Sequence, residues 1–484
     1  MSIRENLRLI ANARIDDRSN ESDEESILSA YEAWGEDCVK HLIGDFAFAI
    51  WDGNKLFCAR DHFGVKPFFY THVNGKFNFS STLNELRPGV SNTLNEIAVG
   101  DYLLFGVNQD NSSTIFKDIQ RLPPGHTLTV RNNEVKIRRY WTPSLPAEVR
   151  YRDSESYVER FLELLTRAVK DRLRTDRVAI SMSGGLDSTS LAAIASEHAE
   201  VAGFTVVYDE LIPDEERHYS DLAAKHLRIP VTHLNADRYS LFDGEMDLPE
   251  PFLVSVLTGQ FNDLLRMCAG FSPVALTGYD GDAFMHEPQV KIRTRIRRML
   301  RKNDQDDGFP EWIDEEFARE TNLRERWKEF WANRVDDGKR PAAMRALNSK
   351  IWTSLFEGYD PGATKLQLDV LHPFLDIRLI EYLLSIPTKP WCVNKHILRR
   401  AMSNKLPAAV LNRPKTGLMG DPALQLVRRA SVRWLDSFEV SPQLRAFVNL
   451  NRRRPLAEEK TSDALWASLR VFALNYWLSK LPTV

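Results

Sequence analysis

The sequence has few cysteines and lacks the long apolar runs that cross membranes. Its four cysteines, Cys38, Cys58, Cys268 and Cys392, are scattered without the paired spacing of a zinc site and fit a reducing compartment. No stretch approaches about 18 uninterrupted apolar residues, and the polar amino terminus has no apolar core of signal-peptide length. These absences predict a cytoplasmic protein that neither spans a membrane nor is exported by that route.

An excess of one charge sign is also missing. The 64 Lys and Arg residues nearly balance the 67 Asp and Glu residues, which leaves a net charge of -3 at pH 7. Such a balance is typical of ordinary globular proteins and does not indicate a nucleic-acid partner. Because 484 residues exceed what one compact core usually holds, at least two domains are expected.

The two parts of the chain have different local patterns. Residues 1–141 alternate short apolar runs with turn residues, which predicts a β-rich domain, and the apolar rhythm of 22–42 predicts a helix packed on its sheet. The proline-rich stretch 142–154 is the predicted linker. Residues 155–484 begin with a helical pattern, and then apolar strands at 178–182, 201–208, 230–234 and 273–277 alternate with helices before a largely helical end. This alternation predicts a parallel α/β sheet.

A glycine-containing loop follows the first of these apolar strands. The run 183–188 reads Ser-Gly-Gly-Leu-Asp-Ser and precedes a helical pattern over 189–199. Two glycines let a ligand approach the backbone, and the first amides of the following helix would face an anion. Asp187 would be an oxygen ligand for Mg²⁺. The run therefore predicts a phosphate-binding loop, distinct from the Walker type because no Gly-Lys-Ser/Thr follows; a turn without a ligand is the alternative.

A second loop of the same kind lies at another strand end. The run 277–282 reads Thr-Gly-Tyr-Asp-Gly-Asp and follows the apolar strand at 273–277. Asp187 and Asp282 could together hold Mg²⁺ on the pyrophosphate of ATP, because Mg²⁺ prefers carboxylate and phosphate oxygens. On its own this second run would indicate only a tight turn.

With both loops, the chain resembles the asparagine synthetase family, which includes the β-lactam synthetases and the lasso-peptide cyclases. The segments 44–52 and 59–70 resemble its glutamine amidotransferase domain, and 372–376 and 412–416 resemble late motifs of its synthetase domain. The resemblance implies an Ntn-type β-rich sandwich followed by an ATP-pyrophosphatase-type α/β domain with a helical carboxyl-terminal part. It also implies adenylation of a carboxylate by ATP and attack by an amine, which gives an amide, AMP and pyrophosphate.

The resemblance assigns roles to single residues. Asp187 and Asp282 would hold Mg²⁺, and Lys415 would stabilise charge in the acyl-transfer transition state. By composition alone, Lys415 would be a surface lysine after a proline turn. The residues that would bind pyrophosphate and nucleotide are Ser183, Gly184, Gly185, Asp187, Ser188, Val206 and Gly278.

The start of the chain departs from the family pattern. Active glutaminases of the family begin with a cysteine after the initiator methionine, whereas this sequence begins Met-Ser-Ile. We therefore expect no glutaminase activity, with a misplaced start codon or a degenerate scaffold domain as the two explanations. Asn12 and Asp23 fall where family members contact glutamine and would form a vestigial pocket. In the other interpretation Asn12 caps a turn and Ser22-Asp23 starts a helix.

Tyr279 stands where the asparagine-forming branch carries a glutamate. A tyrosine there resembles the β-lactam synthetase branch, where it acts with a glutamate to deprotonate an amine of the substrate, and Glu357 is the predicted partner. The alternatives are a packing role for Tyr279 and an exposed helix end for Glu357. The segments 356–362 and 395–399, with Trp391, resemble proteins linked to lasso-peptide production.

Three hypotheses follow. The first is an ATP- and Mg²⁺-dependent macrolactam cyclase that acts on a peptide with an Asp or Glu side chain, with a precursor peptide and its protease as partners. The second is an asparagine synthetase supplied with ammonia or glutamine. The third is an inactive scaffold that binds nucleotide or a peptide. The basic stretch 291–302 is either a partner surface or a solvated helix face.

Overall fold

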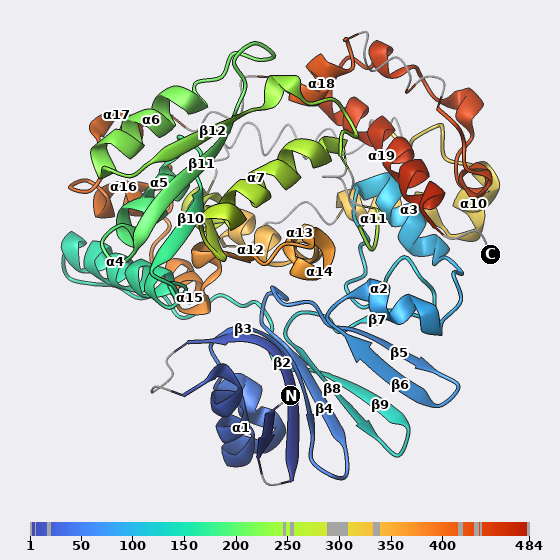
Figure 1. The fold of residues 1–484 in the computed structure, drawn as a ribbon, viewed down its shortest axis with the longest axis horizontal. Coiled ribbons are helices and arrows are strands. Elements are labelled where there is room, and N and C mark those ends of the chain that lie inside the picture. The colour runs from blue at the N-terminus through green and yellow to red at the C-terminus, as the bar shows by residue number, and fades with distance from the viewer. Residues whose placement is uncertain are drawn as a thin grey trace.

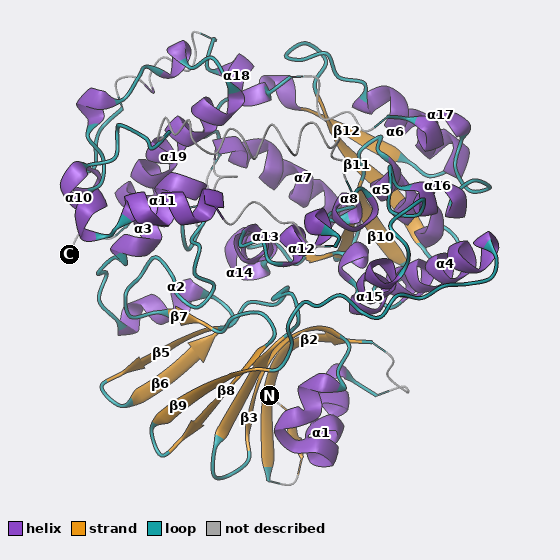
Figure 2. Ribbon diagram, turned by 180° about the vertical axis from the view of Figure 1, so that it is seen from behind, coloured by secondary structure: helices purple, strands orange, loops and turns teal. Residues whose placement is uncertain are grey.

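The fold has a β-rich part and a larger α/β and helical part beside it (Figures 1 and 2). The computed structural model describes residues 2–4, 6–16, 21–244, 248–251, 256–287, 308–332, 339–414, 420–429, 435 and 438–481. None of the helices in these ranges has the length and apolar character needed to cross a membrane.

The β-rich part is a sandwich of two antiparallel sheets, as the sequence predicts. A six-stranded sheet of order β1-β2-β3-β4-β8-β9 packs on a three-stranded sheet of order β6-β5-β7. Ala49 and Leu128 of the larger sheet share a core with Phe68 and Tyr70. The strands are β1 (Ser2–Arg4), β2 (Leu7–Ile15), β3 (Gly44–Trp51), β4 (Leu56–Arg60), β5 (Phe69–Val73), β6 (Lys76–Ser80), β7 (Gln120–Arg121), β8 (His126–Arg131) and β9 (Glu134–Arg139).

Helix α1 (Asp23–Trp34) covers the other face of the larger sheet. Ser22 caps it, because its side chain accepts from the Glu25 amide while the Glu25 side chain accepts from the Ser22 amide. The helix ends at Trp34, and a 3₁₀ helix, η1 (Gly35–Lys40), continues the chain. The predicted helix over 22–42 is therefore two elements, and Trp34, the last residue of α1, is half exposed.

A five-stranded parallel sheet of order β12-β11-β10-β13-β14 organises the second half. Four of its strands lie where the sequence predicts them, and the short fifth strand was not predicted. Its strands are β10 (Arg177–Ser181), β11 (Glu200–Val207), β12 (Val231–Asn235), β13 (Val274–Thr277) and β14 (Asp369–Leu371). Side chains alternate between its faces, as the period of a strand requires.

Helices cover both faces of this sheet. Val178 and Ile180 share a core with residues of α4 (Ser154–Lys170), α5 (Leu186–Ala195) and α6 (Glu216–Leu227), whereas Ala179 and Ala275 share another with α7 (Thr258–Phe271). The later helices are α8 (Gly281–Met285), α10 (Glu315–Glu320), α11 (Leu323–Ala332), α12 (Pro341–Leu347), α13 (Ile351–Tyr359), α14 (Pro361–Thr364), α15 (Ile377–Ser385), α16 (His396–Ala401), α17 (Ala408–Asn412), α18 (Pro422–Leu426) and α19 (Ser462–Ser479).

A further core joins the two halves of the sequence. Helices α2 (Leu83–Leu86) and α3 (Glu96–Phe105) leave the sandwich and pack with the carboxyl-terminal helices (Figure 1). Leu103 and Phe116 share this core with Leu474 and Trp477 of α19. The segment between β6 and β7 is therefore packed with the end of the chain and not only with the sheets that precede and follow it.

Candidate active site

A cavity of about 850 Å³ opens beyond the carboxyl ends of β10, β11 and β13. Ligands of parallel α/β sheets bind at this edge. The cavity wall brings together most of the predicted site residues: Ser183, Gly185, Asp187, Ser188, Val206, Gly278, Tyr279 and Asp282. Gly184, in the first loop, is buried and is not part of the described cavity wall.

The first loop is closed by its two serines. Helix α5 begins at Leu186, three residues before the predicted start, so Asp187 and Ser188 belong to its first turn. The Ser188 hydroxyl accepts from the Ser183 amide at 3.0 Å and donates to the Ser183 carbonyl at 2.9 Å. The first amides of a helix have no intrahelical acceptor, so the start of α5 can donate to an anion in the cavity.

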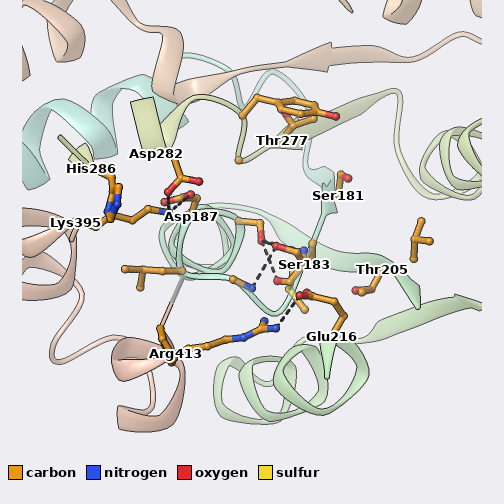
Figure 3. Close-up of a pocket in the computed structure, with 18 of the residues that line it drawn as sticks. Ser181, Ser183, Asp187, Thr205, Glu216, Thr277, Asp282, His286, Lys395 and Arg413 are labelled. Carbon is orange, nitrogen blue, oxygen red and sulfur yellow. Dashed lines mark hydrogen bonds and ion pairs between the residues drawn. The ribbon is translucent and has the colours of Figure 1, made fainter. Parts of the chain in front are cut away.

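The second loop lies directly against the first. A Cβ atom on Gly278 would come 2.9 Å from the Ser188 amide nitrogen, and one on Gly281 would come 2.6 Å from the Asp187 carboxyl carbon. Only glycine avoids these collisions, and this close approach sets Asp187 and Asp282 on the same side of the cavity (Figure 3).

Asp187 and Asp282 converge on one cation. The ammonium group of Lys395 lies 2.5 Å from a carboxylate oxygen of Asp187 and 2.6 Å from one of Asp282 (Figure 3). In the part of the chain that the structure describes, no group of three or more His, Cys, Asp or Glu side chains could hold a metal. Two carboxylates nevertheless fit Mg²⁺, which is commonly held by one or two carboxylates together with water and substrate phosphates.

Tyr279 reaches into the cavity and bonds to a second tyrosine. Its side chain is 40% exposed, and its hydroxyl oxygen accepts from the Tyr359 hydroxyl at 3.0 Å. Burial raises the pKa of Tyr359 well above its usual value, so Tyr359 stays protonated and remains a donor. Next to Tyr279, burial and the Asp282 charge raise the pKa of Asp280 to about 8. Burial also lowers the pKa of His372, near the Tyr279 ring, to about 3.

The predicted pair of Tyr279 and Glu357 is not formed. The Glu357 side chain is 7% exposed and accepts from Arg121 at 2.7 Å and 2.9 Å, with Arg60 at 3.5 Å. It is absent from the described cavity wall and is not an exposed helix end. Helix α13 instead directs Glu357 to two arginines of the first half, so its predicted part in a proton relay is corrected to an ion pair between the halves.

The predicted glutamine contacts lie on the larger sheet and at the start of α1. Asn12 lies in β2 opposite Ala47 and caps no turn. The Asp23 carboxylate accepts from the Ile15 amide at 2.8 Å and from Arg174 of the second half at 2.5 Å. Asp23 is the first residue of α1, as the second interpretation of Ser22-Asp23 holds.

Sequence reasoning missed four charged groups, Arg399 among them, in the wall of the cavity. Lys395, Glu216 and Arg413 all line it, and Figure 3 shows them around the first loop. Lys395 and Arg413 fall inside segments that carried the family resemblance, which was the available signal, whereas Glu216 has none. Lys415, the predicted transition-state lysine, and the basic stretch 291–302 lie outside the described residues.

Comparisons with known sequences match both parts of the chain. A family model described as a glutamine amidotransferase domain matches residues 1–141, and one described as asparagine synthase matches residues 160–479. Asparagine synthetase [glutamine-hydrolyzing] 3 of Bacillus subtilis is 29% identical over 463 residues, which cover 85% of this chain and 73% of that protein.

Further matches are more distant or partial. Asparagine synthetase [glutamine-hydrolyzing] 2 of Bacillus subtilis is 27% identical over 446 residues, which cover 81% of this chain and 58% of that protein. The solved glutamine phosphoribosylpyrophosphate amidotransferase from B. subtilis is 12% identical and covers 48% of this chain and 47% of its own, with a TM-score of 0.21. So low a score carries no information on the site.

Proposed function

The chain belongs to the asparagine synthase family and is an ATP-dependent carbon–nitrogen ligase of the AMP-forming type, and we propose that it closes a lactam ring in a peptide. In this reaction the side-chain carboxylate of an Asp or Glu residue is adenylated and then joined to the amino terminus of the same peptide, with release of AMP and pyrophosphate. The supporting observation is the single cavity that contains the first loop, the two carboxylates and Tyr279.

The first step depends on the two loops. The start of α5 and the hydroxyls of Ser183 and Ser188 would bind the phosphates of ATP. Asp187 and Asp282 would hold Mg²⁺, which would supply positive charge to the pyrophosphate that leaves. Val206 and Gly278, at the ends of their strands, would line the nucleotide. Lys395 is already placed between the carboxylates and would supply a further positive charge.

The second step depends on Tyr279. The nitrogen–carbon bond forms as the bond from the acyl carbon to AMP breaks, and the amine proton passes to water in the open cavity. The Tyr279 oxygen accepts one hydrogen bond from Tyr359 and keeps a second lone pair, which can accept from an N–H of the substrate amine. Tyr279 would thereby orient the attacking amine, and Lys415 would stabilise the charge that develops on the acyl oxygen.

Pyrophosphate exchange into ATP tests the proposal. The purified chain should catalyse exchange with a peptide that carries an acidic side chain, and Asp187→Ala should abolish it by removing a metal ligand. Exchange with free aspartate alone would refute ring closure, and exchange with no carboxylate would favour the inactive scaffold. A neighbouring gene for a small precursor peptide, with one for a protease, would identify the substrate and the partner.

An asparagine synthetase is the second candidate. Two Bacillus subtilis relatives that carry this name match more than four-fifths of the chain, 85% and 81%. In that case aspartate would support exchange, and ammonia or glutamine would be consumed as asparagine forms. Product analysis by mass spectrometry separates free asparagine from a peptide that has lost one water.

A further inference from the structure

A largely buried ion pair joins the first loop to a distant part of the chain. Glu216 is the first residue of α6, and one of its carboxylate oxygens accepts from the Gly184 amide at 2.6 Å. The other accepts from the Arg413 guanidinium at 2.8 Å (Figure 3). The two side chains are only 15% and 9% exposed. A loop amide and an arginine that follows α17 thus share one carboxylate.

Arg413 is held in place from several sides. Its guanidinium lies over the Tyr219 ring, 4.2 Å from the centroid, and its carbonyl accepts from Arg399 at 3.1 Å. A Cβ atom on Gly184 would come 2.8 Å from Nη1 of Arg413 and 2.3 Å from Cβ of Tyr219. Glycine at position 184 therefore allows the guanidinium to lie against the phosphate loop.

One edge of this guanidinium has an unmet donor. Nη1 of Arg413 is buried and has no hydrogen-bond partner within the described part of the chain. Arg413 nevertheless lines the cavity. A buried donor without an acceptor is unfavourable, and a guanidinium suits phosphate because its donors form a planar fork. An anion beside the first loop would supply the missing acceptor.

We propose that Arg413 binds the phosphate chain of the nucleotide and that Glu216 is a positioning residue that holds it against the first loop. The inference rests on the proposed function, because ATP is the nucleotide in question. Both oxygens of Glu216 are already engaged by the Gly184 amide and by Arg413, so its charge is balanced before the anion arrives. Glu216 thus acts on phosphate through Arg413 and through the loop it anchors.

Calorimetric titration of the full chain with inorganic pyrophosphate and, separately, with adenosine tests the role of Arg413. Arg413→Gln should raise the dissociation constant for pyrophosphate at least about tenfold, which is the change expected when one charge-assisted hydrogen bond is lost. The dissociation constant for adenosine should not change. Arg413→Lys should recover part of the loss, because it keeps the charge without the fork. The matched control is Arg217→Gln, since Arg217 lies on α6 and pairs with exposed Asp209.

Two substitutions at Glu216 separate its two contacts. Glu216→Gln keeps an acceptor for the Gly184 amide but removes the negative charge that faces Arg413, so it should weaken pyrophosphate binding by about three- to tenfold. In a double variant with Arg413→Gln, it should cause no further loss of affinity. Glu216→Ala removes both contacts and should weaken binding further. Glu215→Gln, at the exposed neighbour, is the control and should leave binding unchanged.

The possible results discriminate clearly. Unchanged pyrophosphate affinity in Arg413→Gln would refute the arginine as a ligand, and tighter binding in Glu216→Gln would show that the carboxylate opposes the anion. Equal losses for pyrophosphate and adenosine would indicate a general structural role and overturn the assignment. If the unsubstituted chain bound neither ATP nor pyrophosphate, the proposed function would fail first; if it bound both and the variants did too, only this inference would fail.

Discussion

Replacing Glu357 by glutamine separates a structural role from a catalytic one. Glu357 lies with Arg60, Arg121 and Glu250 in a cluster of two positive and two negative side chains, in which the arginines are 0% and 2% exposed. Glutamine keeps the size of the side chain and one acceptor but leaves the cluster with an uncompensated positive charge. Removing one partner of a buried ion pair typically costs about 3–5 kcal/mol.

The expected loss is at the lower end of that range, about 3 kcal/mol, because the arginines retain other acceptors. Arg60 also donates to the carbonyls of Gly64, Lys66 and Leu122. With a urea dependence of about 3 kcal/mol per molar, the unfolding midpoint should fall by about 1 M urea. The measurement is urea unfolding followed by tryptophan fluorescence.

A control and an activity measurement complete the test. Glu163 pairs with Arg160, and its side chain is 61% exposed. Glu163→Gln should therefore change the free energy of unfolding by less than about 0.5 kcal/mol. Measured well below the unfolding midpoint, Glu357→Gln should adenylate and close the amide at rates near those of the unsubstituted chain. An unchanged midpoint combined with a rate of amide formation reduced by about 100-fold or more would restore Glu357 to the proton relay and refute the structural argument.

Three further perturbations address the site and its surroundings. Tyr279→Phe should leave pyrophosphate exchange intact and slow amide formation by about 100-fold, as single-turnover product analysis would show; an equal effect on both steps would contradict a role limited to the amine. Lys395→Met leaves the carboxylates of Asp187 and Asp282 without the ammonium group between them, so the variant should melt at a lower temperature than the parent. Millimolar Mg²⁺ should raise its melting temperature more than it raises that of the parent, as calorimetry would show. Burial lowers the pKa of His62 to about 4, so between about pH 6.5 and 4 the unfolded chain binds a proton that the folded chain does not, and stability falls as the pH falls through this window. His62→Gln should therefore lose less stability than the parent between pH 7 and pH 4 in urea titrations, and identical losses would show that His62 is not the group responsible.

Local patterns predicted the frame of the fold well. The predicted strands of the second half became β10, β11, β12 and β13. Three of them, β10, β11 and β13, are largely buried, and a buried parallel strand needs an apolar run that any window of sequence reveals. The start of α5 was missed by three residues, since the loop glycines conceal the point where helical geometry begins.

Long-range partners could not be read in the same way. Lys395 lies 208 positions from Asp187 and Arg413 lies 197 positions from Glu216, and no local pattern shows that they meet. Glu357 was misassigned for the same reason. The sequence near a helical carboxylate does not show which distant residues its side chain will face in the folded chain. The arginines that bind it come from the other half of the chain, 236 and 297 positions away.

The core that α3 shares with α19 determines how the molecule would behave if it were cut. Proteolytic cleavage within the extended stretch 142–152 would break the covalent connection. The two pieces would nevertheless stay associated through the core that contains Leu103, Phe116 and Trp477. Produced on its own, a fragment that ends at residue 141 would present Leu103 and Phe116 to water and aggregate. Mixed with the remainder of the chain, it should instead recombine into a non-covalent complex.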